Sequence, residues 1–129
     1  MNIRVLLVDD EIEFANYTAK RLSARGMQVQ IAYSGSSALK LVAGHPVDVV
    51  LLDLFMPGMD GFEVFREIRR VCPEAQVIML SGNADREAVA EGEALGAVDY
   101  IRKPCEFSTL LDAIKKADER RADGKLDTR

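Results

Sequence analysis

The sequence has little of what many functional classes require. It contains no tryptophan, one histidine and two cysteines, Cys72 and Cys105. The two cysteines lack the spacing of metal ligands and any secretory context, so we predict free thiols in a reducing compartment. The single histidine, His45, lies between Gly44 and Pro46 in a predicted loop, and we assign it no catalytic role.

Long apolar runs and basic clusters are also missing. No stretch approaches the roughly 18 consecutive apolar residues that cross a bilayer, and Asp9 and Asp10 interrupt the start of the chain where a signal peptide would stay apolar. The formal net charge is −4, with basic residues dispersed among acidic ones, so an electrostatic footprint for nucleic acid is missing. We expect a cytoplasmic protein without a membrane segment and without direct nucleic-acid binding.

The sequence does contain enough apolar residues, 48% of 129, for one hydrophobic core. Five short runs rich in β-branched and aliphatic residues predict strands. These runs are Ile3–Val8, Val29–Ala32, Val47–Leu52, Gln76–Leu80 and Val98–Ile101. The first and third are apolar without alternation, which indicates strands that are covered on both faces near the centre of a parallel sheet.

Segments with helical character separate these runs. The clearest is 60–72, where Phe65 and Ile68 share one face and Asp60 with Glu63 forms a capping-box pattern. Helices are also predicted over Phe14–Leu22, Asp85–Leu95 and Phe107–Ile114. Five β-α units in succession predict an α/β, doubly wound fold, because right-handed crossovers place helices on both faces of the sheet.

The last stretch, 119–129, is charged and lacks periodicity. We expect a frayed helix end or the start of a linker there, in preference to a further element. The predicted domain therefore covers residues 1–118.

Acidic residues follow two of the predicted central strands, at the point where each strand ends. Asp9 and Asp10 come directly after Val8, and Asp53 follows Leu52. Doubly wound folds bind ligands beyond the carboxyl ends of their strands, so we expect these carboxylates to converge. Crowded carboxylates repel one another and favour a hard divalent cation, and Mg²⁺ suits a site that leaves positions for water and phosphate.

Simpler interpretations stay open for single residues. Asp9 or Asp10 could serve only as the N-cap of a helix that begins near Glu11. Asp53 has no such role, because it precedes Met56–Met59, a predicted type II turn with proline second and glycine third. A carboxylate in that position faces the loops at the edge of the sheet.

Two more polar residues follow predicted strands: Ser81 ends the fourth, and Lys103 comes after the fifth. Taken alone, Ser81 is most often a turn residue and Lys103 a solvated charge. Together with the three carboxylates they place five polar groups at the ends of four strands, and this set predicts one site.

The complete set of motifs resembles the receiver domain of two-component response regulators, over Ile3 to about Ala117. The matching motifs are Val8-Asp9-Asp10-Glu11, Asp53–Gly61, Ser81-Gly82, Gly96–Tyr100 and Lys103-Pro104, in the family's order. The resemblance implies a flavodoxin-like (βα)5 fold with parallel strands in the order 2-1-3-4-5. It also implies a regulatory phosphoacceptor and not an enzyme with turnover.

By this resemblance, Asp53 accepts a phosphoryl group from a sensor histidine kinase or a phosphotransfer protein. Asp10 and Asp53 would bind Mg²⁺ directly, Asp9 would bind it through water, and the backbone carbonyl of Phe55 would be a further ligand. Phosphoryl transfer needs in-line positioning and neutralisation of charge. The implied cation and the residues around it would supply both.

The resemblance also implies how the signal is passed on. Ser81 would bind a phosphoryl oxygen, Lys103 would pair with the phosphate, and Ser81 and Tyr100 would move as switch residues. The partner surface, including that of a homodimer, would lie on the fourth helix, the fifth strand and the fifth helix. Gly92 inside the fourth helix indicates weak anchoring. In the family the Lys103-Pro104 bond is cis, although the sequence alone favours trans.

Phe55 and Asn83 occupy positions that modulate the loss of phosphate in the family. A large apolar side chain at residue 55 would screen attacking water, so we hypothesise a comparatively long-lived phosphoryl state.

Three other functions compete with this one. A haloacid-dehalogenase-type phosphatase also places aspartate after a strand, but it requires a second acid two residues later, where Phe55 stands. A flavin- or nucleotide-binding module requires a glycine-rich loop after the first strand, and the sequence lacks one. A receiver-like scaffold that is never phosphorylated disagrees with the intact set of acids, hydroxyl and lysine.

Overall fold

Within residues 2–82 and 86–127, which the computed structural model describes, five strands form one parallel sheet in the order β2-β1-β3-β4-β5. The strands are β1 Arg4–Val8, β2 Gln28–Ala32, β3 Val49–Asp53, β4 Gln76–Ser81 and β5 Asp99–Arg102. Every strand begins and ends within two residues of its predicted bounds. The predicted fold class and strand order are confirmed.

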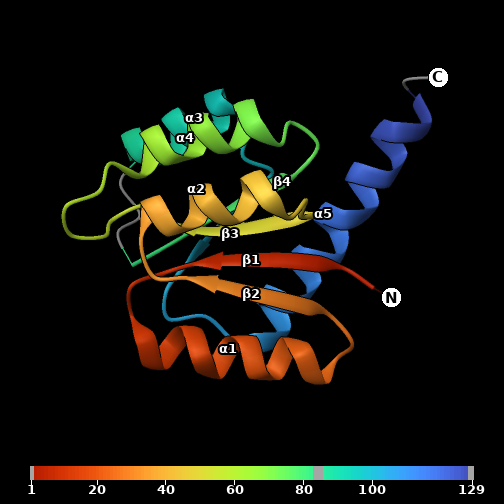
Figure 1. Ribbon diagram of the computed structural model, residues 1–129, viewed down its shortest axis with the longest axis horizontal. Helices are drawn as coiled ribbons and strands as arrows, with labels where there is room; N and C mark the ends of the chain where they lie inside the picture. Colours follow the sequence, from red (N-terminus) through yellow and green to blue (C-terminus); the bar gives the residue numbers. More distant parts are fainter. Residues whose placement is uncertain (1, 83–85, 128–129) are drawn as a thin grey trace.

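Helices cover both faces of this sheet (Figure 1). They are α1 Ile12–Ala24, α2 Gly35–Gly44, α3 Gly61–Val71, α4 Arg86–Leu95 and α5 Phe107–Asp127. α1 and α5 lie on one face, and α2, α3 and α4 lie on the other. The charged stretch after residue 118, for which the sequence left a helix end or a linker open, continues α5 as far as Asp127.

The central strands alternate their side chains between two hydrophobic cores. In β1, Val5 and Leu7 belong to the core shared with α1 and α5, whereas Leu6 and Val8 belong to the core shared with α2 and α3. Every residue of β3 is buried. Burial on both faces is the reason why these two strands are uninterrupted apolar runs in the sequence.

The start of α3 follows the sequence prediction, and the start of α1 does not. Asp60 is the N-cap of α3, and its carboxylate accepts hydrogen bonds from two backbone N–H groups at 3.0 and 3.4 Å. At α1 the N-cap is Glu11, which makes no side-chain capping bond. The interpretation of Asp9 or Asp10 as the cap of α1 is therefore wrong, and both carboxylates are left for another role.

The loop between β3 and α3 contains the predicted type II turn. The N–H of Met59 donates to the carbonyl of Met56 at 3.2 Å, and Gly58 has φ +70°, which glycine adopts without steric cost. α3 then begins against the end of β3. A Cβ at Gly61 would lie 2.6 Å from the Cα and the carbonyl oxygen of Leu54. This close approach keeps the loop after Asp53 tight against the sheet.

We expect Gly61→Ala to destabilise the domain by about 2 to 4 kcal/mol, because the backbone of Leu54 cannot move without displacing the end of β3. Denaturant unfolding measures the change. Gly44→Ala is the matched control: nothing lies within 4 Å of a Cβ there, so its stability should stay equal or rise by up to about 1 kcal/mol. Equal stability of the two variants would contradict the close packing.

A buried carboxylate at the amino-terminal ends of the strands is surrounded by two arginines. The Asp48 carboxylate accepts hydrogen bonds from the backbone N–H and the guanidinium of Arg4, each at 2.9 Å, and lies 3.4 Å from Nε of Arg121 in α5. Burial raises the pKa of Asp48, but the two arginines outweigh it and hold that pKa below its ordinary value. These ion pairs tie the far half of α5 to the start of β3.

The composition predicted free cysteines and no membrane-spanning segment. Both cysteines are free and partly buried. Among residues 2–82 and 86–127, none of the helices combines the length and the hydropathy that a bilayer crossing needs.

Candidate functional site

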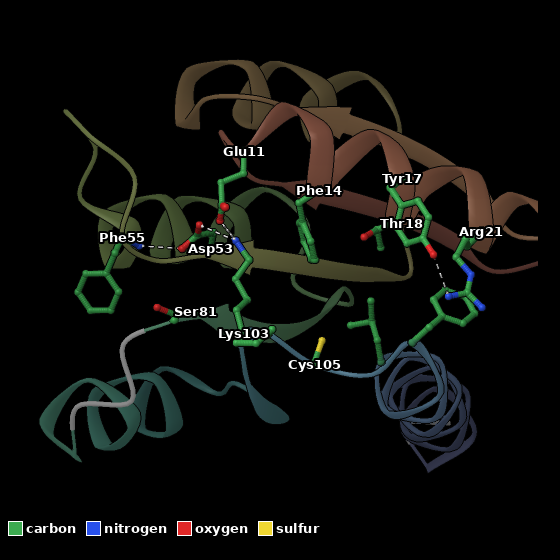
Figure 2. A pocket seen from close by; sticks show the side chains of 14 residues that line it. Glu11, Phe14, Tyr17, Thr18, Arg21, Asp53, Phe55, Ser81, Lys103 and Cys105 are labelled. Carbon is green, nitrogen blue, oxygen red and sulfur yellow. Dashed lines mark hydrogen bonds and ion pairs between the residues drawn. The ribbon is translucent and has the colours of Figure 1, made fainter.

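The carboxyl ends of β1, β3, β4 and β5 meet at one edge of the sheet. A cavity of about 780 Å³ opens there, and Asp53, Ser81 and Lys103 line one end of it (Figure 2). Apolar side chains of α1 and α5, among them Phe14 and Phe107, line the remainder. The strand ends thus bring the predicted polar residues to one place, as expected for a doubly wound fold.

The three predicted acidic residues form one cluster. One carboxylate oxygen each of Asp9, Asp10 and Asp53 lies within 4.8 Å of the other two. Asp9 and Asp53 are buried, whereas Asp10 is exposed. The cluster therefore has a closed side within the sheet and an open side toward solvent.

Backbone N–H groups orient the two buried carboxylates. Oδ1 of Asp9 accepts a hydrogen bond from the N–H of Glu11 at 2.9 Å, and Oδ1 of Asp53 accepts one from the N–H of Phe55 at 3.1 Å. Oδ2 of Asp9 is buried and, apart from its ion pair with Lys103, has no hydrogen-bond donor among the described residues. Burial raises the pKa of Asp9, and Lys103 opposes that shift.

Lys103 reaches into this cluster from the loop after β5. Its Nζ lies 2.7 Å from Oδ2 of Asp9 and 3.4 Å from Oδ2 of Asp53, and it also bonds to Oε1 of Glu11. The backbone N–H of Lys103 donates to the carbonyl of Ser81 at 2.9 Å, which continues the β4–β5 pairing. The Lys103-Pro104 peptide bond is cis, as the resemblance implies.

The carboxylates around Lys103 favour its charged ammonium form. Burial lowers the pKa of Lys103, but the hydrogen bonds to Asp9 and Glu11 and the charge of Asp53 outweigh burial and raise that pKa above its ordinary value. At neutral pH the site therefore presents one positive charge beside the phosphoacceptor candidate.

The other predicted residues lie at different distances from the cluster. Ser81 ends β4, is 1% exposed and lines the cavity. Phe55 is 48% exposed beside Asp53. Tyr100 lies on β5, packs against the second core and lines a separate hollow of about 270 Å³. Asn83 lies outside the described residues.

Sequence reasoning gave no role to two residues that contact Lys103. They are Glu11 and Phe14, whose ring centroid lies 4.5 Å from the ammonium. A signal for both was present, because Glu11 directly follows the acidic pair and Phe14 stands three residues later on the same helical face. The sequence does not show that the Lys103 side chain lies at the start of α1, so the contact with these two residues could not be predicted from it.

The donor set fits a hard divalent cation. All candidate ligands are carboxylate oxygens, two of them buried and one exposed, and Oδ2 of Asp9 is a buried acceptor with the Lys103 ammonium alone beside it. Mg²⁺ prefers such oxygen ligands and keeps several of its waters, which an open side accommodates.

Comparison with known proteins gives one consistent result. The sequence model described as the response regulator receiver domain matches residues 5–115. A response regulator of Rickettsia bellii (strain RML369-C), described as NtrX-like, is 36% identical over 119 residues, which are 91% of this chain and 25% of that protein. The chain thus spans about a quarter of the length of that relative.

Solved structures show the same similarity. A CheY-like response regulator receiver domain protein from Methanospirillum hungatei JF-1 has a TM-score of 0.92 at 27% identity, over 96% of this chain and 99% of that one. A response regulator from Burkholderia pseudomallei has a TM-score of 0.84 at 26% identity, over 98% of this chain and 75% of that one. The latter was crystallised with a phosphorylated aspartic acid, a calcium ion and citrate.

Proposed function

Because the chain belongs to the response regulator receiver domain family, we propose that phosphorylation of Asp53 switches it between two signalling states. The observation that carries this proposal is the convergence of Asp9, Asp10 and Asp53 with Lys103 at one end of the sheet. The phosphorylated aspartic acid in the Burkholderia pseudomallei relative supports it. The donor would be a phosphohistidine of a sensor histidine kinase or of a phosphotransfer protein.

In the proposed reaction, a carboxylate oxygen of Asp53 attacks the phosphorus of the phosphohistidine. The P–N bond breaks, the imidazole leaves, and an acyl phosphate forms on Asp53. The N–H of Phe55 holds Oδ1 at 3.1 Å and so orients the carboxylate. The Lys103 ammonium beside Oδ2 balances charge on the transferred oxygens, and the Ser81 hydroxyl donates to one of them.

Asp9, Asp10 and Asp53, with the backbone carbonyl of Phe55, would hold Mg²⁺. When bound, this ion supplies positive charge next to the phosphoryl oxygens. Asp10 is exposed and would hold the ion from the solvent side, whereas the buried Asp9 would hold it from the inner side. The negative charge of Asp53 also adds to the raised pKa of Asp9, and a bound cation would offset this repulsion.

We place the switched surface on α4, β5 and α5. α4 has two buried residues, Ala88 and Gly92, and Gly92 packs so closely that a Cβ would lie 1.9 Å from Sδ of Met79. Tyr100 lines the adjoining hollow. A helix held by small residues beside a hollow can shift at little cost. Movement of Ser81 toward the phosphoryl group, with Tyr100 turning inward, would reshape this surface for a partner or a second copy.

Labelling with a small acyl phosphate in the presence of Mg²⁺ tests the proposed function. We expect one phosphoryl group per chain, released by hydroxylamine as an acyl phosphate is. Repeated turnover of small phosphate esters would support the rival phosphatase. A chain that stays unlabelled would support an unphosphorylated scaffold.

We expect Phe55→Asn to accelerate the loss of phosphate from the labelled protein by about 3- to 10-fold, because the ring screens the acyl phosphate from water and an amide can bind that water. The decay of labelled protein after removal of the donor measures this rate. Val71→Asn is the control, since Val71 is also a partly exposed apolar residue, 37%, but lies at the far end of α3. An unchanged decay rate in Phe55→Asn would refute the screening role.

A further inference from the structure

The Lys103 ammonium has three carboxylate partners, Asp9, Glu11 and Asp53, before any phosphoryl group arrives. Figure 2 draws two of them, Glu11 and Asp53. The ammonium bonds to Glu11 and lies 2.7 Å from Asp9, whereas Asp53 is the most distant partner at 3.4 Å. An ammonium has three N–H donors, as many as the carboxylates that surround it here. A phosphoryl oxygen can therefore gain an N–H from Lys103 only if one of these partners gives it up.

The side chain of Lys103 is also confined. It is 11% exposed, and its Nζ lies over the ring of Phe14, 4.5 Å from the centroid. A cation over an aromatic face is attracted to it, more strongly when partly desolvated. The ammonium is thus held at the start of α1 and is not free to sample the cavity.

Glu11 differs from the other two carboxylates in its surroundings. Its side chain is 63% exposed, compared with 0% for Asp9 and 8% for Asp53, and it is not part of the predicted metal cluster. Separating an exposed pair costs little, because water replaces the lost contact. Separating Lys103 from Asp9 would leave a buried charge without its partner, which costs far more.

We infer that Glu11 is a positioning residue that restrains phosphorylation by holding the Lys103 ammonium at α1 and competing with the phosphoryl group for it. The inference rests on the proposed function of Asp53. Glu11 is the partner that releases Lys103 when a phosphoryl oxygen arrives. Removing it should therefore make the site easier to phosphorylate.

The test compares the rate of labelling by acetyl phosphate with Mg²⁺ in the full chain and its variants. We expect Glu11→Gln to raise the rate constant about 3- to 10-fold, because the Lys103 ammonium then no longer has to leave an ion-pair partner. Glu13→Gln is the matched control: Glu13 is an exposed residue of the same helical turn and is not an ion-pair partner of Lys103 in the described part of the chain. Its rate should change less than about 2-fold.

Two further measurements separate holding of Lys103 from a general effect of charge or structure. Glu11→Asp keeps the charge but is one methylene shorter, so its rate should lie between those of the unsubstituted protein and Glu11→Gln. The ¹⁵N resonance of the Lys103 ammonium reports its partners directly. It should shift in Glu11→Gln and stay in place in Glu13→Gln.

Each outcome decides between the two proposals. The inference is overturned if Glu11→Gln is labelled no faster than Glu13→Gln, or if the Lys103 resonance does not shift in Glu11→Gln. In either case, labelling of the unsubstituted protein would still uphold the proposed function. Glu11→Asp with an unchanged rate assigns the effect to charge alone and also overturns the inference. If the unsubstituted protein takes up no phosphoryl group, both the proposed function and the inference fail.

Discussion

Replacing Asp53 with asparagine should abolish phosphoryl labelling and leave the fold intact. An amide lacks the anionic oxygen that attacks phosphorus, so we expect labelling below about 1% of the unsubstituted protein. The two side chains have nearly the same shape, and the substitution removes one charge from a crowded acidic cluster. Stability without added cation should therefore stay equal or rise.

Intact-mass spectrometry after incubation with a small acyl phosphate measures this effect. Asp112→Asn is the control, because Asp112 is an exposed carboxylate on α5, and it should be labelled as fully as the unsubstituted protein. Thermal unfolding of both variants verifies the fold. Full labelling of Asp53→Asn would show that another residue accepts the phosphoryl group and would refute the proposed site.

Withdrawal of divalent cations should have the second largest effect and lower the labelling rate by about 10²- to 10³-fold. The physical reason is charge. Without a cation, three carboxylates face an anionic donor, and the single ammonium of Lys103 is already shared among its carboxylate partners. Labelling with a chelator, followed by restoration of Mg²⁺, measures the dependence.

Variants can assign this dependence to the cluster. Asp10→Asn removes the exposed member, so it should weaken the affinity for Mg²⁺ by about 10-fold or more. Glu63→Gln is the control, because Glu63 is an exposed acid in the first turn of α3 outside the cluster. Labelling that is equally fast with and without chelator would contradict a cation in the reaction.

Much of the fold could be predicted from local patterns. Uninterrupted apolar runs are found in strands that are covered on both faces, and the two runs for which the sequence predicted this are the adjacent strands β1 and β3. The cap at Asp60 and the turn at Gly58 were also readable, because capping and positive φ depend on residues next to one another. The cap of α1 was less readable: the sequence left open a cap at Asp9 or Asp10, and the structure has Glu11 there.

The site was predictable in its members but not in its contacts. Acidic residues at strand ends converge because parallel strands place their carboxyl ends at the same edge. The exposure of Asp10 beside a buried Asp9, and the location of Tyr100 at a separate hollow, depend on how helices pack over that edge. Neighbouring residues in the sequence give no information on that packing.

The residue types and the order of the motifs in the sequence therefore determined the family, the sheet and the identity of the acidic, hydroxyl and basic groups at its edge. Tertiary structure alone decided which of them touch. Lys103 and Glu11 are 92 positions apart in the chain, and they meet because the Lys103 side chain extends from the loop after β5 to the start of α1. A contact of that kind depends on the packing of the whole domain, which local propensity does not encode.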